Sequence, residues 1–131
     1  MWETRRVRKQ YNLLPSAHGF DAWDVDRLVE LSAQLPIEDV SLNEISEIDS
    51  AYWYLGDGTQ PTVRSVAEHA RLIEAVDVTF PIILNVDGRV MDGMHRVARA
   101  LIEGRSSVKA VRFIVEPPPD YRDCDPSTLP Y

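Results

Sequence analysis

Residues 81–104 read "PIILNVDGRVMDGMHRVARALIEG", a pattern that predicts a strand, a hairpin turn, a second strand and then a helix. Two apolar runs flank Asp87-Gly88, a pair typical of a tight two-residue hairpin turn. Gly104 is placed to end the helix. Helical spacing predicts a buried helix face formed by Met94, Val97, Ala98 and Leu101. Strands and helices therefore interleave, which predicts an α+β (mixed α/β) class.

Weaker patterns predict further elements on both sides of this stretch. Asp21 or Asp24 would cap a helix that runs to about Gln34. Ser65 and Glu68 have the spacing of a capping box, which predicts the start of another helix. Residues 1–20 show no clear periodicity. Apolar residues predict strands within two other ranges, 39–48 and 106–115.

The composition predicts one compact soluble domain of 131 residues. No apolar run approaches the ~20 residues that span a bilayer, and none follows the basic N-terminus, so we expect neither a membrane segment nor a secretory signal. Cys124 is the single cysteine, which excludes a disulfide framework and fits a cytoplasmic location. We expect three regions: an N-terminal helical extension (1–36), a core (37–116) and a proline-rich tail (117–131).

The charge disfavours nucleic acid as a partner. The net charge is −7, although residues 1–10 carry four basic side chains, so the rest of the chain is strongly acidic. An acidic surface repels a phosphate backbone. Small-molecule ligands are therefore the expected partners.

The junction between the second strand and the helix contains residues suited to binding an anion. A helix start presents unpaired N–H groups and a partial positive charge. Gly93 allows close approach of a ligand to the backbone. His95 and Arg96 add an imidazole and a guanidinium at a helix end where basic side chains are electrostatically unfavourable. The alternative is that Asp92 caps the helix and the two basic side chains are merely solvated.

This stretch resembles the signature of the ParB/sulfiredoxin superfamily, also called the ParB-like nuclease domain. "DVSLNEI" (39–45) is similar to the family's first strand, and "SVAEHARLIEAV" (65–76) to the helix before the Pro-Ile strand, so the resemblance covers about 40–113. It implies a compact mixed sheet flanked by helices that binds a nucleotide. By resemblance, the phosphates would be held by Arg64, Asp92, Gly93, Met94, His95 and Arg96.

Differences within the family narrow the implied activity. Sulfiredoxins carry a catalytic cysteine where this chain has Met94, and Cys124 lies far away in the tail. The chain resembles instead the stand-alone branch of free-serine kinases. In that branch an acid after the first strand, here Asp49 or alternatively Glu47, acts as base on a substrate hydroxyl. The resemblance thus implies a small-molecule kinase that uses ATP or another nucleoside triphosphate, with His95 among its catalytic residues.

Magnesium would accompany the nucleotide, with Asp92 as the candidate ligand. Two other functions stay open: a nucleotide-sensing module with little turnover, and a ParB-like DNA-binding or nuclease protein, which the charge disfavours. The three histidines lack the spacing of a transition-metal site, and His69 is expected to be structural. Three adjacent aromatic residues would either stack on a base or pack in the core: Tyr52, Trp53 and Tyr54.

Overall fold

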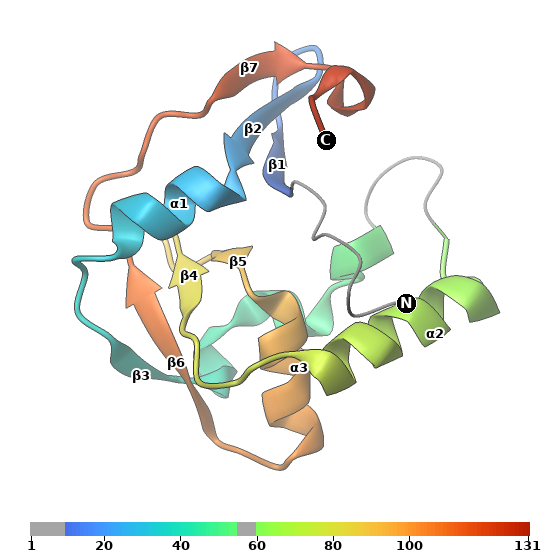
Figure 1. The fold of residues 1–131 in the computed structure, drawn as a ribbon, viewed down its shortest axis with the longest axis vertical. Coiled ribbons are helices and arrows are strands. Elements are labelled where there is room, and N and C mark those ends of the chain that lie inside the picture. Colours follow the sequence, from blue (N-terminus) through green and yellow to red (C-terminus); the bar gives the residue numbers. More distant parts are fainter. Residues whose placement is uncertain (1–9, 55–59) are drawn as a thin grey trace. The chain divides into compact units, whose positions relative to one another are not determined.

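The computed structural model describes residues 10–54 and 60–131 and divides into two units. Leu35–Val115 form one, which we call the central unit. The N-terminal segment up to Gln34 and Glu116–Tyr131 together form the other, which we call the terminal unit (Figure 1). The two segments that flank the core in the sequence therefore pack together in one unit.

The terminal unit contains a three-stranded antiparallel sheet in the order β1-β2-β7. Its strands are β1 (Tyr11–Pro15), β2 (Phe20–Asp24) and β7 (Tyr121–Cys124). The indole N–H of Trp23 in β2 donates to the carbonyl of Pro117 at 2.8 Å, which fixes the proline-rich segment beside the sheet. The sequence patterns indicated none of these three strands, and the segment expected to be a helical extension (1–36) contains β1 and β2 before its helix.

Helix α1 (Val25–Ser32) follows β2 directly and was predicted from the sequence. The Asp24 carboxylate accepts a hydrogen bond from the backbone N–H of Asp26, so Asp24, one of the two proposed residues, is the cap. The helix ends at Ser32, two residues before the expected end.

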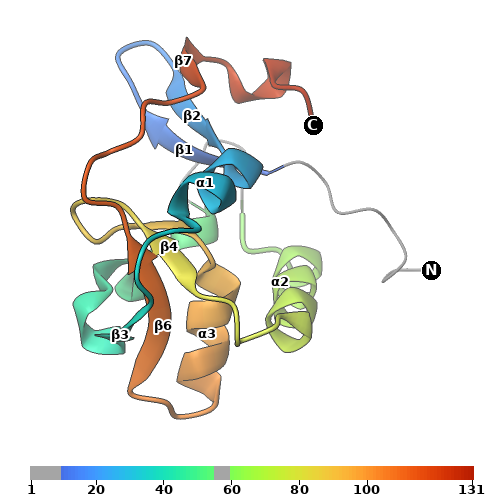
Figure 2. The same ribbon diagram turned by 60° about the vertical axis from the view of Figure 1, so that its left-hand side comes forward.

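The central unit is built on a four-stranded mixed sheet in the order β3-β6-β4-β5. β6 is antiparallel to β3 and parallel to β4, while β4 and β5 form an antiparallel hairpin. The strands are β3 (Glu38–Ser41), β4 (Ile82–Leu84), β5 (Val90–Asp92) and β6 (Ser107–Arg112). Two helices, α2 (Val63–Ala75) and α3 (Met94–Ile102), pack against each other, and α3 also contacts β4 and β6 (Figure 2). The mixed α+β class is confirmed.

The hairpin is also confirmed, but its turn is longer than predicted. The N–H of Asn85 donates to the carbonyl of Arg89, so the loop contains three residues, 86–88, and Gly88 takes a positive φ of 83°. The Asn85 side-chain oxygen accepts from the backbone N–H groups of Asp87 and Arg89. This side chain satisfies two loop donors, which stabilises a three-residue loop where a two-residue primed turn was expected.

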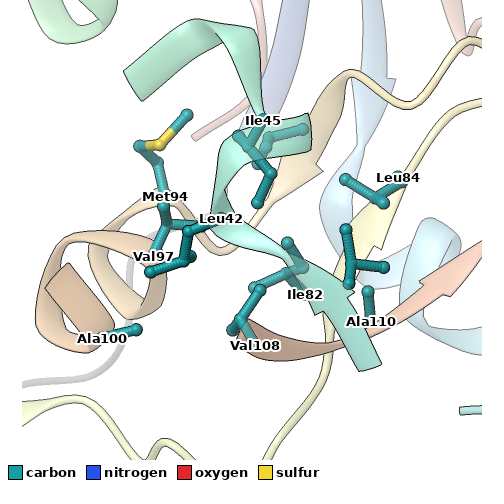
Figure 3. Packing of buried hydrophobic residues seen from close by; sticks show 11 residues of the cluster. Leu42, Ile45, Ile82, Leu84, Met94, Val97, Ala100, Val108 and Ala110 are labelled. Carbon is teal, nitrogen blue, oxygen red and sulfur yellow. The ribbon is translucent and has the colours of Figure 1, made fainter. Parts of the chain in front are cut away.

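The central core lies between the sheet and α3. Figure 3 shows three side chains of α3, Met94, Val97 and Ala100, among those of the strands and the segment after β3. The prediction of Ala98 and Leu101 on this face was wrong, since Leu101 is 46% exposed. The buried residues recur every third position, so α3 contacts the core along a narrow stripe.

Local chemistry sets the helix ends. Gly104 has a φ of 72° and donates to the carbonyl of Leu101, while the N–H of Arg105 donates to that of Ala100, a Schellman ending that confirms the prediction. The predicted start of α2 was wrong. Thr62, not Ser65, caps it by accepting from the Ser65 N–H. In the described parts of the chain, no helix has the length and apolar character needed to cross a membrane.

Candidate functional site

Strand β5 passes into α3 through Gly93, whose φ is 108°. The N–H groups of Arg96 and Val97 both donate to the Gly93 carbonyl, at 2.9 and 3.1 Å. A Cβ at this position would lie only 2.7 Å from Cγ2 of Ile82. Gly93 is therefore the N-terminal cap residue, required by its backbone conformation and by close packing on β4. No side chain caps α3, so the alternative role of Asp92 as helix cap is wrong.

Arg96 has a structural role in addition to its charge. Its guanidinium donates to Asp92 Oδ2 at 2.8 Å and to the Pro81 carbonyl at 3.1 Å, and its side chain is only 16% exposed. These contacts tie the start of α3 to β5 and to the residue before β4. An anion at this helix start would meet an arginine that Asp92 already partly neutralises, although a guanidinium has five donors and these two bonds use only some of them.

His95 forms a pair with His69 of α2. Its Nε2 lies 2.8 Å from Nδ1 of His69, and the two ring centroids are 5.1 Å apart at an interplanar angle of 22°. A short nitrogen–nitrogen distance with this centroid separation means that the imidazoles meet edge to edge. The indole of Trp53 covers both rings, with centroids 4.3 Å from His69 and 4.7 Å from His95 and angles of 19° and 16°.

Both imidazoles are held in the neutral form. Burial, the neighbouring His69 and Arg96 lower the pKa of His95 from 6.5 to about 4. Burial also lowers the pKa of His69, while Glu68 opposes that change. At neutral pH, His95 is therefore a neutral group that carries one N–H and one lone pair.

The lowered pKa of His95 predicts a pH-dependent stability. Between pH 6.5 and about 4 the unfolded chain binds a proton at this position that the folded chain does not. The free energy of unfolding should therefore fall as the pH falls through that window. Urea unfolding of the parent and His95→Phe from pH 4 to 8 measures this, and the variant should show the shallower decline. Equal slopes would contradict the assignment.

Glu47 lies beside the strand that leads into this helix start. It belongs to a 3₁₀ helix, η2 (Ser46–Asp49), and its carboxylate accepts from the N–H of Val90 in β5 at 3.0 and 3.2 Å. Burial raises the pKa of Glu47, although the Val90 N–H and Arg89 oppose this. The carboxyl group is therefore half-buried and more basic than usual. Asp49, in the same 3₁₀ helix, is exposed.

Tyr52 lies close to the same carboxylates. It begins η3 (Tyr52–Tyr54), and its hydroxyl donates to the Val90 carbonyl at 3.3 Å. Burial and the charges of Glu47 and Asp92 raise the pKa of Tyr52 to about 12. Tyr52 is thus a neutral group close enough to Glu47 and Asp92 for the charges of both to raise its pKa.

The other sequence-predicted residues are placed differently. Arg64 lies exposed in the first turn of α2, and no contact joins it to the α3 start within the described residues. Met94 is buried, and its side chain packs in the central core. Only its backbone N–H group is therefore a candidate for binding a ligand. The described residues contain no group of three side chains suited to hold a metal ion. A magnesium ion that arrives with phosphates needs only one or two carboxylates, so the role of Asp92, whose Oδ2 accepts from Arg96, stays a prediction.

Sequence reasoning missed the partnership of His69 with His95. The two residues are 26 positions apart on different helices, and no local spacing signals such a pair. The sequence indicated the aromatic cluster, but not its position over the two imidazoles.

No protein-family model, curated protein or solved structure matches this chain.

Proposed function

We propose that the central unit binds a nucleoside triphosphate by its phosphates at the start of α3 and transfers a phosphoryl group to a hydroxyl of a small metabolite. The observation that carries this proposal is the position of Glu47. Its carboxylate accepts from the N–H of Val90, which lies two residues before Asp92 and four before Met94, the first residue of α3. A carboxyl group of raised pKa on the strand that leads into a helix N-terminus supports this proposal, because phosphoryl transfer to a hydroxyl calls for a base and for groups that position the phosphates.

The helix start supplies positioning and charge. The first N–H groups of α3 point out of its N-terminus, and Gly93 adds no side chain of its own there, while Ile82 and the Arg96 guanidinium pack close beside it. His95 provides a neutral donor and Arg96 a permanent charge with donors to spare. Magnesium, when bound, neutralises phosphate charge. Phosphoryl transfer asks little more than this of a protein.

Glu47 would act on the acceptor. As the acceptor oxygen bonds to the γ-phosphorus, the bond from that phosphorus to the bridging oxygen breaks and the nucleoside diphosphate leaves. The hydroxyl proton passes to Glu47, whose raised pKa suits it to accept a proton. Tyr52, with a pKa of about 12, keeps its proton and serves to hold the Val90 carbonyl.

A nucleotide-sensing module is the second candidate, favoured by the cover over His95. Trp53 lies flat on both imidazoles, so a ligand that reaches His95 from this face must displace the indole. Such a displacement would be a ready signal for a partner. Turnover separates the two functions, because a module binds triphosphate without transferring its γ-phosphate to any hydroxyl compound. A DNA-binding or nuclease role is disfavoured by the net charge of −7.

Replacing His95 by phenylalanine should weaken nucleotide binding. The ring stack under Trp53 would persist while the donor is lost, so the dissociation constant of a non-hydrolysable triphosphate with magnesium should rise roughly 10- to 150-fold, the scale of one hydrogen bond to a charged group. Isothermal titration measures it. His18→Phe is the matched control, because His18 lies exposed in the terminal unit. Unchanged affinity in His95→Phe would contradict the assignment of the phosphate site to the start of α3.

A further inference from the structure

The edge-to-edge contact of the two histidines leaves the position of one proton to be assigned. His95 Nε2 and His69 Nδ1 are 2.8 Å apart, so one of them donates and the other accepts. Within the described residues this is the one hydrogen bond of the His95 side chain, so Nδ1 is the ring nitrogen that remains for a ligand. The direction of the bond to His69 therefore decides what Nδ1 offers.

Phosphate oxygens at neutral pH accept hydrogen bonds. A neutral imidazole has a single N–H, so His95 can donate from Nδ1 only when its Nε2 is a bare acceptor. His69 must then carry its proton on Nδ1 and donate it to His95. If the bond ran the other way, a lone pair of His95 would face the phosphates and repel them.

Neighbouring groups hold the pair in place. Trp53 lies flat on both rings, which opposes a ring flip at either histidine. The edge of the Tyr54 ring packs on His69 at 5.7 Å and 80°, and the Tyr54 hydroxyl is 2.9 Å from that of Ser65 on the same helix. Of the charged groups around the pair, Arg96 opposes protonation of His95 and Glu68 favours protonation of His69.

We propose that His69 is a positioning residue that donates from Nδ1 to His95 Nε2 and thereby makes the neutral His95 ring an Nδ1–H donor for acceptor-only anionic oxygens. This rests on the proposed function, because it assigns the phosphates of the nucleotide as the ligand of that donor. Beyond the proposed function, this assignment means that the site binds fully ionised phosphate without taking up a proton. The lowered pKa of His95 is consistent with this, since the ring need not become charged to bind.

The tautomers can be read directly in the free protein. Long-range ¹H–¹⁵N spectra at pH 7.5 distinguish protonated from bare ring nitrogens, and the chain has only three histidines to assign. We expect a proton on Nδ1 of both His69 and His95 and a bare Nε2 on His95. A proton on His95 Nε2 would overturn the proposal. This measurement needs no ligand, so it decides the assignment even if no nucleotide binds, a result that would count against the proposed function alone.

Variants of His69 test the consequence for binding. His69→Phe keeps a ring under Trp53 but removes the donor, so the dissociation constant of a magnesium–triphosphate analogue should rise about 3- to 10-fold, the scale of one neutral hydrogen bond. His69→Asn retains an N–H donor and should restore affinity and the Nδ1–H form of His95. Equal affinity of His69→Phe and the parent, or failure of asparagine to rescue, would contradict the role.

Proton uptake supplies an independent readout. Titration of the parent with the analogue in two buffers of different ionisation enthalpy at pH 7 should give equal observed binding enthalpies, before any correction for buffer ionisation, which means that no net proton is bound. Uptake of about one proton would show that His95 binds as an imidazolium, with affinity rising about tenfold for each unit the pH falls. That result would overturn the assignment of a neutral donor.

Discussion

Glu47→Gln is expected to slow phosphoryl transfer about 10²- to 10⁴-fold while nucleotide affinity stays near that of the parent. Glutamine keeps the size of the side chain and an oxygen that can accept from the Val90 N–H, but it cannot take a proton. The loss should therefore fall on the acceptor step. Single-turnover kinetics with an accepted hydroxyl compound, beside titration with a non-hydrolysable triphosphate, separates the two effects.

Asp49→Asn is the matched control for this prediction. Asp49 belongs to the same 3₁₀ helix and carries the same charge, but it is exposed and lies outside the contact with β5. We expect its loss to leave transfer close to the parental rate. If Asp49→Asn is the slow variant and Glu47→Gln is not, the base has been assigned to the wrong carboxylate. If the parent binds nucleotide but transfers to no acceptor, the sensing function replaces the enzyme.

Gly93→Ala should cost about 2–5 kcal/mol of unfolding free energy. The positive φ of 108° strains any L side chain, and the new methyl group would lie 2.7 Å from Ile82 Cγ2 and 3.1 Å from the Arg96 guanidinium. Domains are stable by only about 5–15 kcal/mol, so the loss would be large. Urea unfolding monitored by circular dichroism gives the midpoint and slope.

Gly104→Ala separates backbone strain from crowding. Gly104 also has a positive φ, 72°, but a Cβ there would meet nothing within 4 Å. Its substitution should cost only about 1–2 kcal/mol, the strain alone. Equal losses of unfolding free energy at the two glycines would mean that Ile82 of β4 moves to accommodate the new methyl group. Close packing of Gly93 on β4 would then not be required.

The parts that sequence reasoning predicted correctly are those formed by neighbours in the chain. The β4–β5 hairpin, α3 and its end at Gly104 depend on contacts over a few residues, and each was found. Errors at this range came from competing side chains. Thr62 caps α2 in place of Ser65, and the side chain of Asn85 stabilises a longer β4–β5 turn than the one predicted.

The parts that could not be predicted depend on distant partners. Strands β1 and β7 lack an alternating pattern of their own and exist because each pairs with β2. In the candidate site, the sequence favoured Asp49 as the base and gave Glu47 as the alternative, whereas the structure brings Glu47 into contact with β5. That contact depends on Val90, 43 positions away, which no local pattern reveals. The pairing of the histidines is equally invisible to any local pattern.

The pairing of β2 with β7 has a consequence for how the chain is made. Phe20 pairs with Cys124, and the carboxylate of Asp120 accepts from the N–H of Asp24, so β1 and β2 meet their partner strand only after the whole central unit has been translated. All of the central unit leaves the ribosome before β7 does. We therefore expect the central unit to fold first during synthesis, with β1 and β2 remaining an open hairpin until β7 emerges and pairs with β2.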